Sequence, residues 1–122
     1  MPAHDLADVI GDDYCYLTTT GRRSGLPREI EIWFGLEGLT LYLLAGSGER
    51  AQWVRNLRTK PAVSVRLRDH TYRGRARVVS DPVEDAAVRR MLVEKYQPRS
   101  SGDLAHWGKT ALPVAVDLSS DP

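Results

Sequence analysis

Residues 62–79 read AVSVRLRDHTYRGRARVV, and two runs in this stretch alternate between small or apolar residues and polar, mostly basic ones. An alternation with a period of two residues is typical of a β-strand that buries one face. The predicted inward residues are Val63, Val65, Leu67, Tyr72, Gly74, Ala76 and Val78. Asp69, His70 and Thr71 form the predicted turn, so 62–69 and 72–79 make an antiparallel hairpin.

The outward face of this hairpin is basic. Its arginines are Arg66, Arg68, Arg73, Arg75 and Arg77. With any short turn, Arg66 is expected opposite Arg73 or Arg75, and like charges directly across a strand pair destabilise it. Two explanations stay open at this point. Either Glu29 and Glu31 on a neighbouring strand offset the charges in a solvated lattice of ion pairs, or an anionic ligand does so.

Four more segments outside the hairpin are predicted to be strands. They are YCYLTTT at 14–20, REIEIWFG at 28–35, LTLYLLA at 39–45 and LPVAVDL at 112–118. In 28–35 the inward residues Ile30, Ile32 and Phe34 alternate with the outward residues Glu29, Glu31 and Trp33. Residues 36–38 are the expected hairpin turn. Because 39–45 is almost entirely apolar, both faces of that strand are expected to be covered.

Two segments have helical character. The first is expected from about Glu49 to Arg58, with Ser47 or Gly48 as its cap and Pro61 preventing its continuation. The second starts at Asp81-Pro82, a good helix start, and ends before Pro98. Its predicted buried residues are Ala87, Val88, Met91 and Leu92. Residues 99–109 are expected to be a loop.

The predicted element order is β-β-β-α-β-β-α-β within a single domain, residues 1–122. Short strands that follow one another as hairpins favour an antiparallel barrel over a doubly wound parallel sheet. We therefore expect a mainly β (α+β) fold, a small six-stranded antiparallel barrel with two flanking helices.

The net charge of +1 conceals a strong asymmetry along the chain. Residues 21–79 contain twelve basic and five acidic residues, a net charge of +7, whereas the segments before and after carry −4 and −2. Such a basic block can attract a polyanion such as nucleic acid, a membrane surface or a phosphorylated cofactor.

Other classes of site and location have little support. The single cysteine, Cys15, excludes an internal disulfide, and His4, His70 and His106 are scattered, so no metal site is expected. No apolar run is long enough to span a bilayer. The acidic start, MPAHDLADVIGDD, lacks the features of a signal peptide, so we expect a cytoplasmic protein.

The loop between the first two predicted strands suggests an anion-binding site. Residues 18–28 read TTTGRRSGLPR, in which glycines permit turns that expose backbone amides and arginines offer charged, planar donors. A second candidate is the GSGE helix start at 46–49. Each feature also has a simpler interpretation: the first can be an ordinary surface loop, and the second can be only a helix cap.

Taken in order, the TTTGRRSGLPR loop, the LAGSG stretch, QWVRNLRTKP and the strand after it resemble the deazaflavin-dependent nitroreductase family. That family belongs to the split β-barrel flavin and deazaflavin oxidoreductases. The resemblance covers residues 14 to about 80. It implies the coenzyme F-420, an 8-hydroxy-5-deazaflavin with a phosphate and an oligoglutamate tail, which suits the basic block.

The resemblance also implies a set of cofactor-binding residues. Those expected at the phosphate side are Arg22, Arg23, Ser24, Gly25 and Arg28. Those expected against or near the ring and tail are Ile30, Glu31, Ala45, Gly46, Ser47 and Gly48, with Trp53 and Asn56 on the flanking helix. The segment before Trp53 is shorter here than in many family members. No residue firmly matches the family's substrate pocket, for which Tyr96, His106 and Trp107 are the nearest equivalents.

The implied activity is hydride transfer from the reduced deazaflavin to a small electrophilic substrate of quinone, nitro or enone type. Tyr16, Tyr42 and Tyr96 are candidate proton donors. The alternatives are a split barrel that binds FMN or heme and a deazaflavin-binding protein without turnover. Nucleic acid binding has little support, because only Trp33 is expected among the outward strand residues as a stacking aromatic. A homodimer through a sheet face is possible in such barrels.

Overall fold

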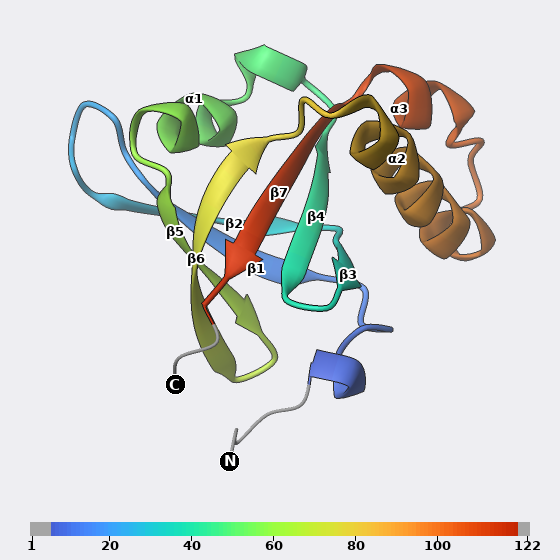
Figure 1. Cartoon of the computed structure of the whole chain (residues 1–122), viewed down its shortest axis with the longest axis horizontal. Coiled ribbons are helices and arrows are strands. Elements are labelled where there is room, and N and C mark those ends of the chain that lie inside the picture. Colours follow the sequence, from blue (N-terminus) through green and yellow to red (C-terminus); the bar gives the residue numbers. More distant parts are fainter. Residues whose placement is uncertain (1–5, 120–122) are drawn as a thin grey trace.

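The computed structural model describes residues 6–119, so His4 lies outside the described residues. In this range one curled antiparallel sheet has seven strands in the order β2-β1-β5-β6-β7-β4-β3 (Figure 1). The strands are β1 Cys15–Thr20, β2 Pro27–Ile32, β3 Gly35–Glu37, β4 Thr40–Ala45, β5 Ala62–Leu67, β6 His70–Val78 and β7 Leu112–Leu118. The helices are α1 Gln52–Thr59, α2 Pro82–Tyr96 and α3 Ala105–Thr110, with short 3-10 turns η1 Leu6–Asp8, η2 Gly48–Arg50 and η3 Gln97–Arg99.

The mainly β antiparallel barrel predicted from the sequence is confirmed, with seven strands instead of six over residues 6–119. The extra strand arises because the predicted strand 28–35 is interrupted at Phe34. The Phe34 amide donates to the Tyr96 hydroxyl at 2.9 Å, and its carbonyl accepts from the Lys95 ammonium, also at 2.9 Å. The backbone thus bonds to α2 at this point, and β3 then pairs with β4 around a turn in which Gly38 has φ +60°.

The prediction that residues 99–109 form a loop is partly wrong, because the helix α3 occupies Ala105–Thr110. Gly108 lets this helix approach α2 closely, since a Cβ there would lie 2.5 Å from a methyl carbon of Val93. Arg89 of α2 donates to the carbonyl oxygens of Gly108 and Lys109 at 3.0 and 2.9 Å. A helix of only six residues is therefore stabilised by packing and by side-chain bonds to its last carbonyls.

The predicted helix 49–58 is divided into η2 and α1, because Ala51 between them has extended backbone angles. In the hairpin, the turn lies at Arg68–Asp69, and Arg68 has φ 58°. This earlier turn places Arg66 opposite Thr71. The expectation that Arg66 faces Arg73 or Arg75 is therefore wrong.

Nearby groups accommodate the charge of Arg66. Its guanidinium lies 4.2 Å from the centre of the Tyr16 ring and 3.8 Å from a carboxylate oxygen of Glu29. Glu31 instead accepts a hydrogen bond from Tyr16 at 2.6 Å. Of the two explanations left open, the first is borne out only in part for Arg66, because one ion pair with Glu29 takes the place of the expected lattice.

The curled sheet has an apolar cluster on each face. The inner cluster fills the barrel, and α1 lies across one opening (Figure 1). The second cluster lies between the outer face of β4 and β7 and the helices α2 and α3. β4 contributes Leu41 and Leu43 to the first and Tyr42 and Leu44 to the second, so the predicted coverage of both its faces is confirmed.

Trp33 does not stand on an open polar face as expected. It packs between Tyr96 and Trp107 in the second cluster. None of the helices within residues 6–119 combines the length and the apolar character needed to cross a bilayer.

Candidate functional site

A pocket of about 450 Å³ lies between the β1–β2 loop, the start of β2 and α1. Its lining residues are Gly21, Arg22, Arg23, Ser24, Arg28, Ile30, Gln52, Trp53 and Asn56. Volumes of 300–1,000 Å³ are usual for small-molecule sites. Two segments that are far apart in the sequence, the arginine loop and the helix after β4, thus form one site.

The loop is held in a compact shape by its own backbone. The Gly21 amide donates to the Leu26 carbonyl at 2.8 Å, and the Gly25 amide donates to the Gly21 carbonyl at 2.9 Å. The Ser24 hydroxyl accepts from the Leu26 amide at 3.1 Å. Gly25 has φ +72°, a conformation that favours glycine, and a Cβ on Gly21 would displace the Ser24 hydroxyl oxygen, which would lie 2.5 Å from it.

Three guanidinium groups belong to the pocket wall. Arg28 stands on β2 opposite Thr19, and its Nη2 lies 3.5 Å from the Ser24 hydroxyl oxygen. Arg22 bonds to Asn56, as described below. Arg23 is exposed and makes no hydrogen bond or ion pair within residues 6–119. At least two of these three positive charges therefore face solvent without an acidic partner at hydrogen-bonding distance.

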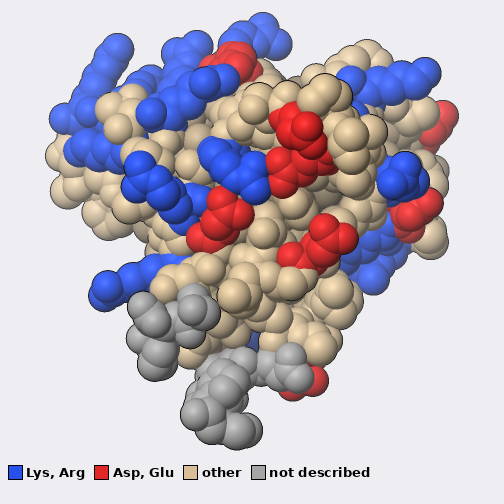
Figure 2. All heavy atoms as spheres, viewed as in Figure 1, with Lys and Arg blue, Asp and Glu red and all other residues tan. Residues whose placement is uncertain are grey.

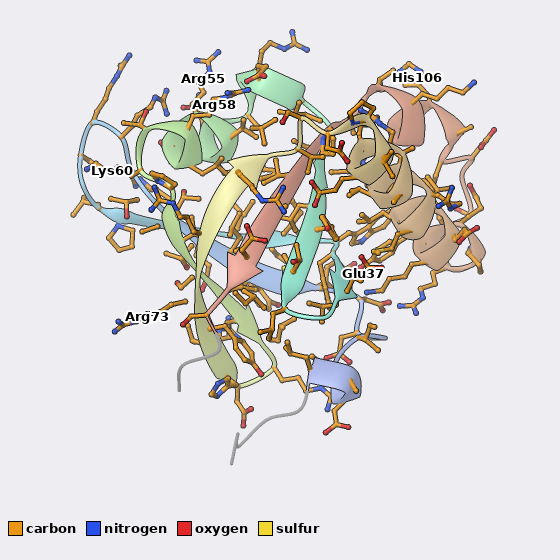
Figure 3. All side chains as sticks on the ribbon, viewed as in Figure 1. Glu37, Arg55, Arg58, Lys60, Arg73 and His106 are labelled. Atoms are coloured by element: carbon orange, nitrogen blue, oxygen red, sulfur yellow. The ribbon has the colours of Figure 1, made fainter. Side chains whose placement is uncertain are left out.

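The surroundings of the pocket are also basic. In Figure 2, Lys and Arg gather at the upper left, over α1 and the β1–β2 loop. Arg55 and Arg58 project from α1, and Lys60 follows it (Figure 3). Of these, Arg58 is paired with Glu49 of η2. Part of the predicted basic block is thus gathered around the pocket (Figure 2), where it can attract an anionic ligand, whereas Arg68 and Arg77 of the same block pair with acidic residues elsewhere.

Ile30 and Trp53 give the pocket an apolar wall. Ile30 lies on β2 opposite the fully buried Leu17. Trp53 lies on α1, and both residues are partly buried against the inner cluster. A flat, apolar ligand group can therefore lie against this wall while a charged group reaches the arginines.

Asn56 joins α1 to the loop and to β1. Its Oδ1 accepts from the Arg22 amide at 3.2 Å and from Arg22 Nη1 at 2.9 Å. Its Nδ2 donates to the Thr19 hydroxyl oxygen at 3.2 Å. Asn56 and Thr19 are 4% and 1% exposed, so the bond between them is shielded from water, whereas the bonds from Arg22 are partly buried.

The structure therefore brings together seven residues expected from the resemblance. These are Arg22, Arg23, Ser24, Arg28, Ile30, Trp53 and Asn56. Gly21 and Gln52 also line the pocket but were not expected. The available signal was adjacency, because each directly precedes a matched residue, Arg22 or Trp53.

Six other expected residues do not line this pocket. Gly25 belongs to the same loop, and the exposed Glu31 bonds to Tyr16. Ala45 is 2% exposed at the end of β4, and the bend after it contains Gly46, Ser47 and Gly48. Gly46 lies near α3, since a Cβ on Gly46 would be 3.9 Å from Cδ1 of Trp107.

The three candidate tyrosines all lie outside the pocket lining. The Tyr96 hydroxyl bonds to the backbone of Asp13 and Phe34, and burial raises the pKa of Tyr96 to about 12. Tyr42 donates to Glu84 at 2.7 Å, and burial together with this bond raises its pKa to about 12. The bond to Glu31 raises the pKa of Tyr16, the one of the three whose hydrogen bond is exposed.

No group of His, Cys, Asp and Glu side chains within residues 6–119 is arranged to hold a metal ion. The pocket lining likewise offers donors suited to an anion rather than ligands suited to a cation.

Comparison with solved structures supports the fold assignment. The chain is similar to the conserved hypothetical protein Rv2991 from Mycobacterium tuberculosis, with 21% identity over 94% of this chain and 79% of that one and a TM-score of 0.73. An F420-H2 dependent reductase has 23% identity over 88% and 95% and a TM-score of 0.69. The heme storage protein HutZ from Vibrio cholerae has 14% identity over 95% and 89% and a TM-score of 0.75. At these identities the likeness concerns the fold alone.

The family model gives the assignment that the structures do not. The model of the F420H(2)-dependent quinone reductase family matches residues 6–119, which is nearly the whole chain and includes the loop, the strands and the helix that form the pocket. The protein therefore belongs to the F420H(2)-dependent quinone reductase family and is an oxidoreductase of the deazaflavin-dependent type.

Proposed function

We propose that the pocket between the β1–β2 loop and α1 binds the deazaflavin coenzyme and that the enzyme transfers hydride to a small electrophilic organic substrate. The observation that carries this proposal is the convergence of Arg22, Arg23 and Arg28 with the apolar wall of Ile30 and Trp53 in one pocket. This combination suits a ligand with a flat ring at one end and an anionic group at the other.

The residues present fit such a ligand. Guanidinium groups form bidentate, charge-assisted bonds with phosphate oxygens. Arg23 and Arg28 are exposed in the pocket wall, and the glycine-rich loop allows a ligand to approach the backbone closely. Ile30 and Trp53 offer the surface against which a ring can pack. The residues of the Gly46 bend and Glu31 remain predicted contacts of the ring and tail.

When bound, the deazaflavin supplies the hydride chemistry. The chain's own residues have simpler tasks. Arg22, Arg23 and Arg28 hold the anionic group, Trp53 and Ile30 fix the ring plane and exclude water from one side of it, and the side-chain amide of Gln52 can bond to a polar edge of the ligand. No acid–base pair of the chain is required for binding or orientation. Tyr16 remains a predicted proton donor to be tested.

The alternatives differ in how well they suit this pocket. Heme iron is usually held by a His, Cys, Met or Tyr side chain, and the pocket lining contains none of these. FMN has both a phosphate and a flat ring, so it remains the main alternative cofactor. Binding without turnover is the other alternative.

We propose a quinone, nitro compound or enone as substrate, since each accepts hydride at an electron-poor atom. A cytoplasmic location and a homodimer remain predictions from the sequence. Measurements of the protein's localisation and of its molecular mass in solution would test these two predictions.

The proposal is tested by titrating the purified protein with the deazaflavin, FMN and heme side by side, followed by absorbance and fluorescence. We expect the deazaflavin to bind with the lowest dissociation constant of the three ligands. We also expect menadione or a nitroaromatic to oxidise its bound reduced form. Tighter binding of FMN or heme would contradict the cofactor assignment. Tight deazaflavin binding without oxidation would indicate a carrier rather than an enzyme.

A further inference from the structure

Asn56 lines the cofactor pocket, yet its side chain is almost fully engaged with the protein. An amide oxygen has two lone-pair directions. Both are used in Asn56, because Oδ1 accepts from the Arg22 amide and from Arg22 Nη1. Of its two N–H groups, one donates to Thr19. At most one N–H of this side chain is left for a ligand.

We infer that Asn56 is a positioning residue that acts on the ligand through Arg22, and that it is not primarily a contact of the cofactor. This inference rests on the proposed function of the pocket. The Asn56 side chain joins three segments: α1, which carries it; β1, which carries Thr19; and the loop, which carries Arg22. The buried bond to Thr19 anchors the Asn56 side chain, and the two partly buried bonds from Arg22 fix the loop backbone and the guanidinium at the same time.

The two bonds to Arg22 have different consequences. The bond from the backbone amide sets where the loop leaves β1. The bond from Nη1 restricts a long side chain that would otherwise sample many rotamers. An arginine whose rotamers are already restricted loses less entropy when it binds an anion, which favours affinity.

The neutrality of asparagine is important for this role. A carboxylate at this position would form an ion pair with Arg22 and offset the charge that the pocket offers to an anion. It would also lose the N–H that bonds to Thr19. An amide orients the guanidinium and leaves its positive charge available.

The other two arginines have no equivalent support. Arg28 has one long contact, 3.5 Å to the Ser24 hydroxyl oxygen, and Arg23 makes no hydrogen bond or ion pair in the part of the chain that the structure describes. Arg22 is thus the fixed member of the three, and Arg23 and Arg28 are free to adapt to the ligand.

A double-mutant cycle for deazaflavin binding tests the inference. We expect Asn56→Ala to weaken binding by roughly tenfold, as expected for loss of an optimally placed charged donor. In an Arg22→Ala background the same substitution should have a clearly smaller effect than in the wild type, because the guanidinium through which Asn56 acts has been removed and only its bond to the backbone amide remains. Fully additive losses in the double variant would show that Asn56 does not act through the Arg22 guanidinium and would overturn the inference.

A measurement without ligand separates this inference from the proposed function. Hydrogen exchange of the Arg22 amide, followed by NMR, should be slow in the wild type and in Arg22→Ala, which keeps the backbone N–H, and fast in Asn56→Ala. If the wild type binds no deazaflavin, the proposed function fails, and the exchange rates still decide the role of Asn56. Unchanged protection of the residue-22 amide in Asn56→Ala would refute that role.

If Asn56→Ala does not fold, Thr19 provides a second route. Thr19 does not line the pocket, and among residues 6–119 its hydroxyl makes one hydrogen bond, which it accepts from Asn56. Thr19→Val should increase exchange at the Arg22 amide, and Thr19→Ser, which keeps the hydroxyl, should restore the wild-type rate. Equal exchange rates in both variants would contradict the inference.

Discussion

The rings of Trp33 and Tyr96 are stacked, with centroids 4.2 Å apart and planes that differ by 1°. Trp33 lies between β2 and β3, and Tyr96 is the last residue of α2. The Tyr96 hydroxyl accepts from the Phe34 amide at 2.9 Å and donates to the Asp13 carbonyl at 2.7 Å. One tyrosine therefore fixes the interruption between β2 and β3, the segment before β1 and the end of α2.

Removal of this hydroxyl should affect stability rather than cofactor binding. Tyr96→Phe keeps the stacked ring but leaves the buried Phe34 amide without its partner and removes the partly buried bond to the Asp13 carbonyl, which costs about 1–3 kcal/mol. We expect the free energy of unfolding in urea to fall by that amount and the deazaflavin affinity to stay the same. Normal stability with lost turnover would instead support Tyr96 as a proton donor.

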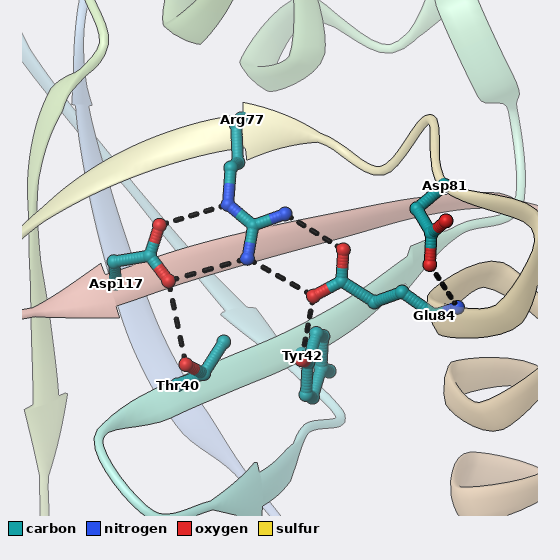
Figure 4. Close-up of polar contacts among 6 residues, drawn as sticks. All are labelled: Thr40, Tyr42, Arg77, Asp81, Glu84 and Asp117. Carbon is teal, nitrogen blue, oxygen red and sulfur yellow. Dashed lines mark hydrogen bonds and ion pairs between the residues drawn. The ribbon is translucent and has the colours of Figure 1, made fainter.

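A second polar cluster joins α2 to the sheet (Figure 4). Arg77 of β6 bonds to Glu84 of α2 at 2.8 and 3.0 Å and to Asp117 of β7 at 2.8 and 3.3 Å. Tyr42 of β4 donates to the same Glu84 carboxylate at 2.7 Å. The bonds from Arg77 and Tyr42 lower the pKa of Glu84 from 4.5 to about 2.

This cluster predicts acid sensitivity. Since the pKa of Glu84 is lower in the folded protein, its ionised form contributes stability that is complete above the unfolded pKa near 4.5 and is lost as the pH falls towards about 2. Glu84→Gln should reduce the free energy of unfolding at pH 7 by about 1–3 kcal/mol. The difference from wild type should shrink between pH 5 and pH 2 in urea titrations. A constant difference over that range would contradict the assignment.

The arginine loop should not tolerate a side chain at Gly21. A Cβ there would lie 2.5 Å from the Ser24 hydroxyl oxygen and 3.2 Å from the Leu26 carbonyl oxygen, so either the loop shifts or the Ser24 hydroxyl turns away and loses its bonds to Leu26 and Arg28. We expect Gly21→Ala to weaken deazaflavin binding by roughly tenfold or more, because the arginines of the pocket move with the loop. The matched control is Gly102→Ala, whose Cβ has only Ser100 Oγ near it, at 4.0 Å. Equal deazaflavin affinities of the two variants would show that the loop does not take part in binding.

The bend after β4 can be tested in the same way. Gly46→Ala fits the protein, since its Cβ would have one neighbour, Cδ1 of Trp107 at 3.9 Å. If the ring or tail of the coenzyme approaches this bend as the family resemblance implies, the methyl group should lower the affinity while the melting temperature stays unchanged. Unaltered affinity would show that the site ends at the pocket lining.

Much of the fold could be predicted from local patterns in the sequence. The alternation in the hairpin defined two strands, and the apolar run at 39–45 correctly indicated a strand covered on both faces. The pattern could not reveal that the Phe34 backbone bonds to the Tyr96 and Lys95 side chains. These residues are about sixty positions away, and without those bonds the strand would be expected to continue.

The helix α3 and the hairpin register were missed for related reasons. α3 is six residues long and depends on Arg89 and on the close approach of Gly108 to Val93, which are tertiary contacts. The register depends on Arg68 adopting φ 58°, an uncommon conformation for a residue other than glycine. Once the turn moved by a residue, the expected pairing of arginines across the strands was lost.

The sequence predicted which residues of each segment line the candidate site better than it predicted the contacts between segments. The loop residues from Arg22 to Arg28 and the helix residues Trp53 and Asn56 meet in one pocket. What the sequence could not show is that Asn56 faces Arg22 rather than open space in that pocket, because this requires the position of α1 relative to β1.

The central claim is that Arg23 and Arg28 bind the anionic part of the deazaflavin, and affinity measured by fluorescence titration tests it most directly. Arg23→Ala with Arg28→Ala removes two charges from the pocket, whereas Arg73→Ala with Arg75→Ala removes two from β6, outside the pocket lining. We predict that the pocket variant loses about 3–6 kcal/mol of binding free energy, at about 1.5–3 kcal/mol for each charged bond, and that the β6 variant binds nearly as tightly as wild type. Equal losses in the two variants, or no loss in the pocket variant, would contradict the claim.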